Sequence, residues 1–229
     1  LGVNVPLLTN RPHLYFADPT PPVEDYWVVC SGGKRDFTTK LWGRHNYQQV
    51  VRSLNGIKFV QVGGSKPVVP WSASCVGSQE DEHPPLEGVE NLVGKTTLRE
   101  LFDLVRRARG VVCGVSLLMH VAAALEKPCV VIAGGREPVT WNAYNNMRYL
   151  HTVGSLSCRD AHGRVGGACW RYRTIPLGDG TILDRDTCEY PTDGIPRCMS
   201  LITPAYVVET IIQIERGKYA CVEKNSGAC

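Results

Sequence analysis

Several side chains that could bind a diphosphate are grouped around one predicted strand–helix–strand unit. Ser116 and His120 are four residues apart, so on a helix their side chains share one face and lean towards its N-terminus. Four further residues with suitable chemistry follow the second predicted strand: Gly134, Gly135, Arg136 and Glu137. The glycines would let a ligand approach the backbone, and the guanidinium could pair with a phosphate. We therefore expect a hydroxyl, an imidazole and a cation to meet at one diphosphate site.

The elements that would position these groups lie in the stretch 111–138. Two short apolar runs, Val111 to Gly114 and Cys129 to Ala133, are rich in valine and bounded by glycine or proline, as strands buried on both faces are. Between them, Leu117 to Leu125 is long enough for a helix, and Ser116 is placed to cap it. The strand ends and the helix N-terminus would form one rim that favours an anion. Taken singly, a histidine on an apolar helix is more often a core residue and Gly-Gly is more often a turn, so the prediction depends on their convergence.

A second unit of the same kind precedes this one. The pattern predicts a strand over Tyr26 to Ser31, a helix over Arg44 to Leu54 and a strand over Ile57 to Val62. The loop after the first strand begins at Ser31 and contains glycines, hydroxyls and lysines, including Lys40. Such a loop can cradle a phosphate or can simply be a solvated basic loop, and its composition alone favours neither. The two units together predict an α/β fold, a Rossmann-like parallel sheet flanked by helices.

Two common nucleotide-binding motifs are absent from the sequence. Gly94-Lys95-Thr96-Thr97 precedes a predicted helix over Leu98 to Ala108, and Thr97 with Glu100 forms a capping-box pattern. A P-loop would need a glycine at a fixed position before the Gly-Lys pair, and that glycine is missing. The chain also lacks a Gly-x-Gly-x-x-Gly fingerprint, so ordinary P-loop and NAD-binding readings are disfavoured.

Composition indicates a soluble globular protein. The 229 residues can bury a sizeable core, the net charge of +3 is too small to indicate nucleic-acid binding, and no apolar run is long enough to cross a membrane. The chain begins without a methionine or a signal-peptide pattern, so we expect its start to be internal to a longer protein. The proline-rich residues 1–25 predict a linker, and residues 26–229 predict the folded lobe.

Seven of the ten cysteines fall into two groups. Cys30, Cys113 and Cys129 lie in predicted core strands, where free thiols act as small apolar residues, and this usage favours a reducing, cytoplasmic location. Residues 154–200 have little apolar periodicity and are costly to order unless something fixes them. This segment contains four cysteines, separated by ten, eighteen and nine residues: Cys158, Cys169, Cys188 and Cys198. Four thiolates around one zinc or iron ion would order the segment, and two disulfides are the alternative. Regular structure is predicted to return at Thr203-Pro204, which opens a helix through Glu215.

The central stretch resembles the C-terminal lobe of the ADP-heptose heptosyltransferases, which are family-nine glycosyltransferases of the GT-B fold. Lys40 and Trp42 also match the Lys-x-Trp motif of that family, although Gly43 replaces the usual proline. In the family this lysine contacts the phosphates of the sugar nucleotide, and the turn matching Lys95 and Thr97 lies near the nucleotide. The matching residues of the central stretch are Gly114, Ser116, Met119, His120, Ala122 to Ala124, Pro128 and Gly134.

The resemblance implies an enzyme of lipopolysaccharide biosynthesis that moves a heptose from ADP-heptose to a hydroxyl with inversion and without a catalytic metal. The acceptor would be a glycan or a protein. The catalytic base would belong to an N-terminal lobe that this chain does not contain, so we name no catalytic residue. Some autotransporter-modifying heptosyltransferases carry a four-cysteine iron finger, which residues 154–200 resemble.

One departure from the family leaves the function open. The family usually has an acidic residue before the Ser/Thr of the central motif and a glycine after it, where this chain has Val115 and Leu117. In the family that acid contacts the donor sugar, so the departure indicates a different donor sugar or a loss of activity. The alternatives are a non-catalytic binding or assembly module and a sugar-nucleotide epimerase of similar architecture.

Overall fold

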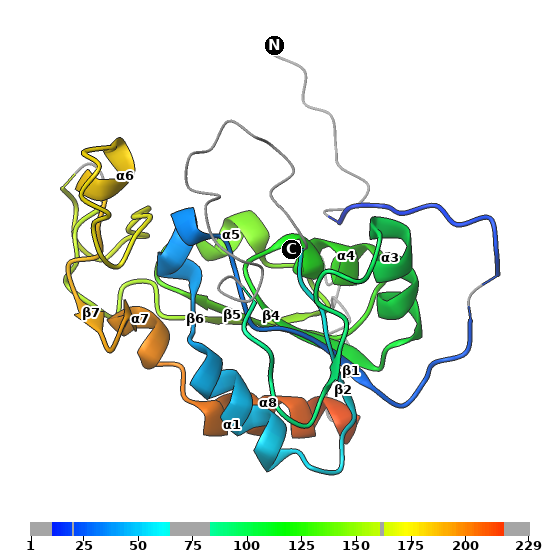
Figure 1. The fold of residues 1–229 in the computed structure, drawn as a ribbon. Coiled ribbons are helices and arrows are strands. Elements are labelled where there is room, and N and C mark those ends of the chain that lie inside the picture. Colours follow the sequence, from blue (N-terminus) through cyan, green and yellow to red (C-terminus); the bar gives the residue numbers. More distant parts are fainter. Residues whose placement is uncertain (1–10, 20, 65–82, 161–162, 218–229) are drawn as a thin grey trace, which may run out of the picture.

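Six parallel strands form the central sheet (Figure 1). The computed structural model describes residues 11–19, 21–64, 83–160 and 163–217. The strands lie side by side in the order β3-β2-β1-β4-β5-β6, so the predicted α/β fold with a parallel sheet is confirmed. Their bounds are β1 (Trp27–Cys30), β2 (Phe59–Gln61), β3 (Glu90–Asn91), β4 (Gly110–Gly114), β5 (Cys129–Gly134) and β6 (Met147–His151).

The middle strands are buried on both faces, as their valine-rich sequences predict. Val28 of β1 is in register with Val111 of β4, and Val112 of β4 is in register with Val130 of β5. All four residues have essentially no exposed surface. The two short or irregular edge strands, β3 and β6, have no such apolar run and were not predicted by the sequence pattern.

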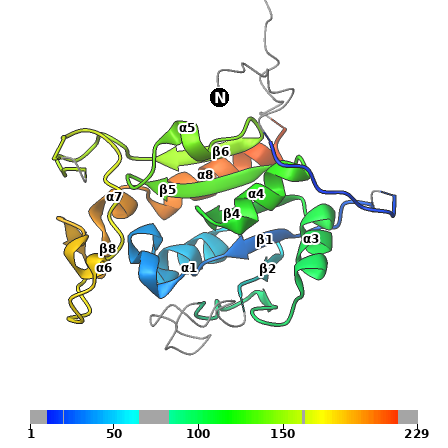
Figure 2. The same cartoon turned by 90° about the horizontal axis from the view of Figure 1, so that it is seen from above.

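Two pairs of helices cover the sheet, one on each face (Figure 2). The helices α3 (Leu98–Arg107) and α4 (Leu117–Ala124) pack on one face through residues such as Val105 and Met119. The helices α1 (Arg44–Ser53) and α8 (Pro204–Glu215) pack on the other face through residues such as Val50 and Ile211. None of the described helices is long and apolar enough to cross a membrane.

The three predicted helix starts are confirmed, and two of them have the expected capping hydrogen bond. Thr97 and Glu100 form the expected reciprocal capping box at α3, and the Thr203 side chain accepts a hydrogen bond from the Tyr206 N–H at α8. Ser116 occupies the N-cap position of α4, but its side chain makes no capping hydrogen bond. Ser116 therefore has the predicted position at the helix start, but it does not supply the hydrogen bond expected of a cap.

The described part of the predicted linker lies against α3. The guanidinium carbon of Arg106 lies 4.0 Å from the ring centroid of Phe16, and Arg99 lies 5.6 Å from the same ring. Arg106 also donates hydrogen bonds to the carbonyls of Asp18 and Pro19. A buried arginine therefore fixes the approach segment to the lobe. Residues 1–10 of the predicted linker and residues 218–229 lie outside the described residues.

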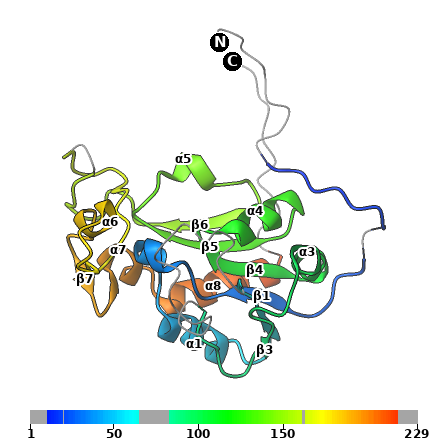
Figure 3. The same cartoon turned by 45° about the horizontal axis from the view of Figure 1, so that its top comes forward.

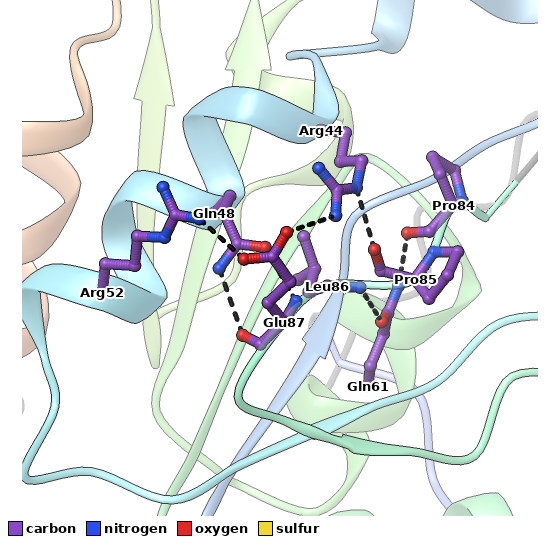
Figure 4. Close-up of polar contacts among 8 residues, drawn as sticks. All are labelled: Arg44, Gln48, Arg52, Gln61, Pro84, Pro85, Leu86 and Glu87. Carbon is purple, nitrogen blue, oxygen red and sulfur yellow. Dashed lines mark hydrogen bonds and ion pairs between the residues drawn. The ribbon is translucent and has the colours of Figure 1, made fainter.

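A set of polar contacts holds residues 84–87 to α1 and β2 (Figure 4). The side chain of Gln61 donates to the Pro84 carbonyl and accepts from the Leu86 N–H, while Gln48 makes a similar pair of bonds with the backbone of Glu87. The Glu87 carboxylate lies 2.7 Å from Arg52. These contacts satisfy the fully buried Gln61 amide at the end of β2.

The cysteine-rich segment lies beyond the carboxyl ends of β5 and β6 (Figure 3). It contains short elements only: α6 (Ile182–Arg185), the antiparallel pair β7 (Pro191–Thr192) and β8 (Ile195–Pro196), and α7 (Arg197–Ser200). Two further short helices, η1 (Arg35–Lys40) and α5 (Val139–Asn142), also follow strand ends. All of this irregular structure therefore gathers at one edge of the sheet.

Candidate functional site

The strand order changes direction where β1 and β4 lie side by side. The chain leaves β1 towards α1 on one face of the sheet and leaves β4 towards α4 on the other face, which makes this a topological switch point. The loop after β1 ends in η1 and folds over the end of β4. A Cβ atom placed on Gly114 would lie 3.5 Å from the carbonyl oxygen of Lys40. The loop after β1 therefore reaches the switch point.

A cluster of charged side chains surrounds Glu137 at this edge. The Nζ of Lys40 lies 2.6 Å from Oε1 of Glu137, and Arg136 pairs with the same oxygen. Asn142 of α5 donates a hydrogen bond of 2.7 Å to the other carboxylate oxygen. Glu137 is buried, whereas about a quarter of the Lys40 side chain is exposed. A buried carboxylate with three donors holds the ammonium of Lys40 at the surface of the rim.

Arg136 serves as an internal support in this cluster. Its Nε donates to the Arg171 carbonyl at 2.8 Å, and its guanidinium carbon lies 4.9 Å from the Tyr172 ring centroid and 5.2 Å from that of Phe37. The residue is 5% exposed. A guanidinium enclosed by aromatic rings and a carboxylate is already satisfied, so its described contacts orient Glu137.

His120 lies next to the same charges. Its Nδ1 is 2.8 Å from the hydroxyl oxygen of Tyr144, and the two rings meet edge to face. Burial lowers the pKa of His120, the positive charge of Lys40 lowers it further, and Glu137 partly opposes both effects. The imidazole is therefore mostly neutral at pH 7. The structure thus brings Lys40, His120 and Glu137 together, as the sequence predicts.

Of the two predicted hydroxyls, that of Ser31 has a hydrogen-bond partner in the protein, whereas the buried Oγ of Ser116 has none among the described residues. Ser31 is buried at the end of β1, and its hydroxyl accepts a hydrogen bond of 3.0 Å from Gln61. Ser116 lies at the start of α4 beside the thiol of Cys113. Both residues are on the rim, so they remain candidates for contact with a ligand.

The two glycines after β5 are required for packing. A Cβ atom on Gly134 would overlap the side chain of Met199, and Gly134 also has a positive φ of 63°. A Cβ atom on Gly135 would lie 3.3 Å from the Cβ of Cys198. Side chains of α7, rather than a ligand, fill the space in front of both glycines. The expectation that these two glycines let a ligand approach the backbone is therefore wrong.

Lys95 and Thr97 lie at the same edge of the sheet but several strands away. They follow β3, which is separated from β4 by β2 and β1, a spacing of roughly 14 Å. Lys95 donates to the Asn91 carbonyl at 2.9 Å, and Thr97 belongs to the capping box of α3. The structure does not bring these two residues to the Lys40 cluster.

The four predicted metal ligands border one small cavity. Its volume is about 20 Å³, which is enough for a single atom-sized occupant. The cysteines on its lining are Cys158, Cys169, Cys188 and Cys198. Burial raises the pKa of all four thiols, to about 11 for Cys198. These cysteines are free thiols in the structure.

The sulfurs receive several backbone hydrogen bonds. The backbone N–H of Gly135 donates to the sulfur of Cys198. In the same way, the N–H of Arg171 donates to Cys169 and the N–H of Tyr190 donates to Cys188. N–H groups directed at sulfur favour the thiolate form that metals bind. Within the described ranges, however, no group of three or more Cys, His, Asp or Glu side chains is close enough to hold a metal ion. The four thiols share a cavity without converging on one point.

Three side chains that support the charged cluster around Glu137 were not predicted from the sequence: Thr39, Asn142 and Tyr144. Asn142 and Tyr144 contact Glu137 and His120, and Thr39 donates to the Arg171 carbonyl at 2.7 Å. Asn142 and Tyr144 follow the predicted Arg-Glu pair within eight residues, so their polar types were a usable signal. The Thr39 contact spans 132 residues and had no signal in the sequence.

A family model described as glycosyltransferase family 9 (heptosyltransferase) matches residues 9–163. The lipooligosaccharide heptosyltransferase 2 of Haemophilus influenzae is 32% identical over 104 residues, and the lipopolysaccharide heptosyltransferase 2 of Salmonella typhimurium is 28% identical over 101 residues. Each alignment covers 43% of this chain and 28% of the relative. The chain therefore matches only part of these proteins.

Solved structures share the fold. An Escherichia coli ADP-heptose heptosyltransferase II matches 95% of this chain and 57% of its own chain, with a TM-score of 0.55 and 18% identity. The iron-containing dodecameric glycosyltransferase TibC of enterotoxigenic E. coli matches 90% of this chain and 49% of its own, with a TM-score of 0.55 and 20% identity. These likenesses agree with the observed parallel sheet and its flanking helices.

Proposed function

This chain belongs to glycosyltransferase family 9 (heptosyltransferase), and from that premise we propose that it forms the donor-binding lobe of a heptosyltransferase-like enzyme. Its ligand would be a nucleotide-diphosphate sugar, and ADP-heptose is the first candidate because structures of related enzymes are described with ADP-heptose and its analogues. The observation that carries the proposal is the Lys40–Glu137 pair at the switch point of the sheet.

Lys40 would hold the diphosphate. The ammonium of Lys40 has three N–H donors, and Glu137 does not use all of them. About a quarter of the Lys40 side chain is exposed, so the remaining donors can reach a ligand. The N–H groups at the start of α4 face the same rim and would add partial positive charge. In glycosyl transfer the nucleoside diphosphate leaves with increased negative charge, which a fixed cation beside it would stabilise.

The remaining predicted residues would contact different parts of the nucleotide sugar. Ser116 and His120 would contact the diphosphate or the sugar from α4, and Gly134 to Glu137 would shape the end of β5. Lys95 and Thr97 would contact only the far end of the nucleotide, because they lie at the β3 side of the sheet. Val115 and Leu117 replace the acid and the glycine of the family motif, so this chain would contact the sugar through other groups.

The activity of the whole enzyme requires groups outside this lobe. We propose that the base that deprotonates the acceptor hydroxyl comes from an N-terminal lobe, and that the acceptor is a glycan or a protein. The names of the two curated relatives favour lipooligosaccharide or lipopolysaccharide biosynthesis as the setting, and we propose a cytoplasmic location. Family membership favours this reading over an epimerase or a non-catalytic module.

We also propose that the four cysteines hold one structural zinc or iron ion. The donor set suits either metal, because tetrahedral thiolate sites bind both. The shared cavity and the N–H groups on three of the sulfurs support the fit, and the thiols would have to rotate to reach one centre. The name of the iron-containing TibC adds iron to the candidates.

Calorimetric titration tests the donor proposal directly. The chain should bind ADP-heptose or another ADP-sugar, and it should bind ADP more weakly if the sugar is also recognised. A panel of UDP-, GDP- and ADP-sugars would identify the base. Failure of every nucleotide sugar to bind, even after the N-terminal lobe of a family member is added, would refute the donor-lobe proposal.

A further inference from the structure

Trp141 is exposed at the edge of the proposed donor site. It is 66% exposed, whereas Trp27 and Trp42 are completely buried in the core. An exposed indole forgoes the burial free energy that a large apolar side chain can gain. A tryptophan in this position beside polar, charged groups is typical of a ligand-binding surface.

A second tryptophan fixes the orientation of the first. The ring centroids of Trp141 and Trp170 are 4.5 Å apart with an interplanar angle of 65°, so the rings meet edge to face. Trp170 has a positive φ of 58°, which a bulky residue adopts only when its surroundings impose it. The backbone N–H of Trp170 donates to the Arg136 carbonyl at 3.0 Å. The Arg136 guanidinium carbon lies 5.7 Å from the centroid of the Trp170 ring. The pair is therefore tied to the Arg136–Glu137 dipeptide.

Trp141 is also joined to the site through its own helix. The next residue, Asn142, donates a 2.7 Å hydrogen bond to Glu137, whose other oxygen pairs with Lys40. The indole thus belongs to the residue next to one that contacts the cation–carboxylate pair. An edge-to-face pair leaves one broad ring face open but makes no slot between parallel rings, which a planar base would need.

We propose that Trp141, held by Trp170, is a platform on which the ring of a sugar stacks. A pyranose has an apolar face of C–H groups and an edge of hydroxyls, so it can cover an indole while its hydroxyls reach charged groups such as Glu137 and Lys40. This inference rests on the proposed function and identifies a sugar-binding subsite within it. The sugar can be that of the nucleotide donor or that of the acceptor.

Three titrations distinguish these sources, and each compares the unaltered chain with Trp141→Ala. The ligands are ADP, an ADP-sugar and a methyl pyranoside that carries no nucleotide. If the donor sugar stacks, Trp141→Ala should weaken ADP-sugar binding about tenfold while leaving ADP binding unchanged. If the acceptor sugar stacks, only the methyl pyranoside should lose affinity, measured in both proteins by NMR signals of the pyranoside itself.

Two controls keep the test decisive. Trp141→Phe retains an aromatic face and should stay within about threefold of the unaltered chain. Tyr206→Ala removes a similarly exposed ring, 54% exposed on α8, and should change none of the affinities. Equal loss of ADP and ADP-sugar binding in Trp141→Ala would indicate stacking on the base and overturn the proposal, as would unchanged affinity for both sugar ligands. If ADP and ADP-sugar fail to bind the unaltered chain, the donor proposal fails, and the pyranoside titration still decides whether Trp141 binds a sugar.

Discussion

Gly135 and Cys198 lie so close together that a Cβ atom on the glycine would stand 3.3 Å from the Cβ of the cysteine. The Gly135 N–H is also bonded to the Cys198 sulfur, and the Gly135 carbonyl accepts from the Cys169 N–H at 3.1 Å. The end of β5 and the cysteine-rich segment therefore meet backbone to backbone. Since Arg136 and Glu137 follow directly, the geometry around Lys40 depends on this contact.

Substitution of Gly135 by alanine should destabilise the chain by about 1–3 kcal/mol. The added methyl group would press on Cys198, which has little freedom to move because its carbonyl accepts a 2.8 Å hydrogen bond from the Thr152 hydroxyl. The free energy of unfolding in urea measures this effect. Limited proteolysis should also show faster cleavage within residues 154–200 of the variant.

Gly167→Ala is the matched control for that variant. Gly167 belongs to the same segment, its φ is not in the left-handed region, and a Cβ atom there would have no neighbour within 4 Å. Its free energy of unfolding should stay within about 0.5 kcal/mol of the unaltered chain. If both variants were equally destabilised, close packing at Gly135 would not be the cause.

Lys40→Ala should weaken binding of an ADP-sugar by about 1–3 kcal/mol, because a charge-assisted hydrogen bond to phosphate is lost. The free Glu137 carboxylate would retain Arg136 and Asn142 as partners, so the fold should survive. Calorimetry of the unaltered chain and the variant measures the difference. Lys58→Ala is the control, since Lys58 forms an exposed ion pair with Glu90 at 3.0 Å, at the start of β2 and far from the rim. Equal loss of affinity in both variants would point to a general charge effect.

The sequence predicted the parts of the fold in which local pattern and burial agree. The valine-rich strands β1, β4 and β5 are buried on both faces, so their apolar runs were diagnostic. The strand β3 has only Glu90 and Asn91, and neither is apolar. It exists because its backbone pairs with β2, which is a tertiary effect that no local pattern encodes.

The same distinction holds for the candidate site. Lys40 and His120 could be predicted because each follows a predicted strand or lies on a predicted helix. The burial of Arg136 could not be predicted, because it depends on Phe37 and on Tyr172 from the cysteine-rich segment. The reason for Gly134 and Gly135 was misjudged for a similar cause. Met199 and Cys198, more than sixty residues later in the chain, fill the space that we had assigned to a ligand.

Binding of an ADP-sugar should become tighter as the pH falls below 6.5, the ordinary pKa of histidine. Without ligand, burial and then the charge of Lys40 hold the pKa of His120 below that value. A bound diphosphate would offset the Lys40 charge and raise the pKa of His120, so the complex takes up a proton in this range and affinity increases. A shift of one unit corresponds to about tenfold. Titrations at pH 7.5 and at pH 5.5 measure the change.

His120→Asn is the comparison for this pH effect. Asparagine keeps a polar side chain that can contact the Tyr144 hydroxyl but does not titrate, so the variant should lose most of the pH dependence. An ADP-sugar is preferable to ADP as the ligand, because its diphosphate has no terminal group that titrates near pH 6. If the variant keeps the full pH dependence, His120 does not lie close enough to the diphosphate to sense it.

Purified under reducing conditions, the chain should contain about one zinc or iron ion, held by the four cysteines that border the small cavity. Few residues of the segment from 154 to 200 are buried and apolar, and metal binding can contribute on the order of ten kcal/mol to ordering it. Because burial raises the pKa of these thiols, they are protonated at pH 7 without metal. Metal uptake should therefore release protons, and apparent affinity should fall as the pH is lowered.

Cys169→Ser tests this site against Cys129→Ala. The first variant removes a proposed ligand, so elemental analysis should find less metal and residues 154–200 should become protease-sensitive while the sheet stays folded. The second removes a thiol that is completely buried in β5, within the core on the α3–α4 face, and should keep its metal. Mass spectrometry without reductant supplies the opposing outcome. Two disulfides among Cys158, Cys169, Cys188 and Cys198, with no bound metal, would show that covalent links rather than a metal ion order this segment.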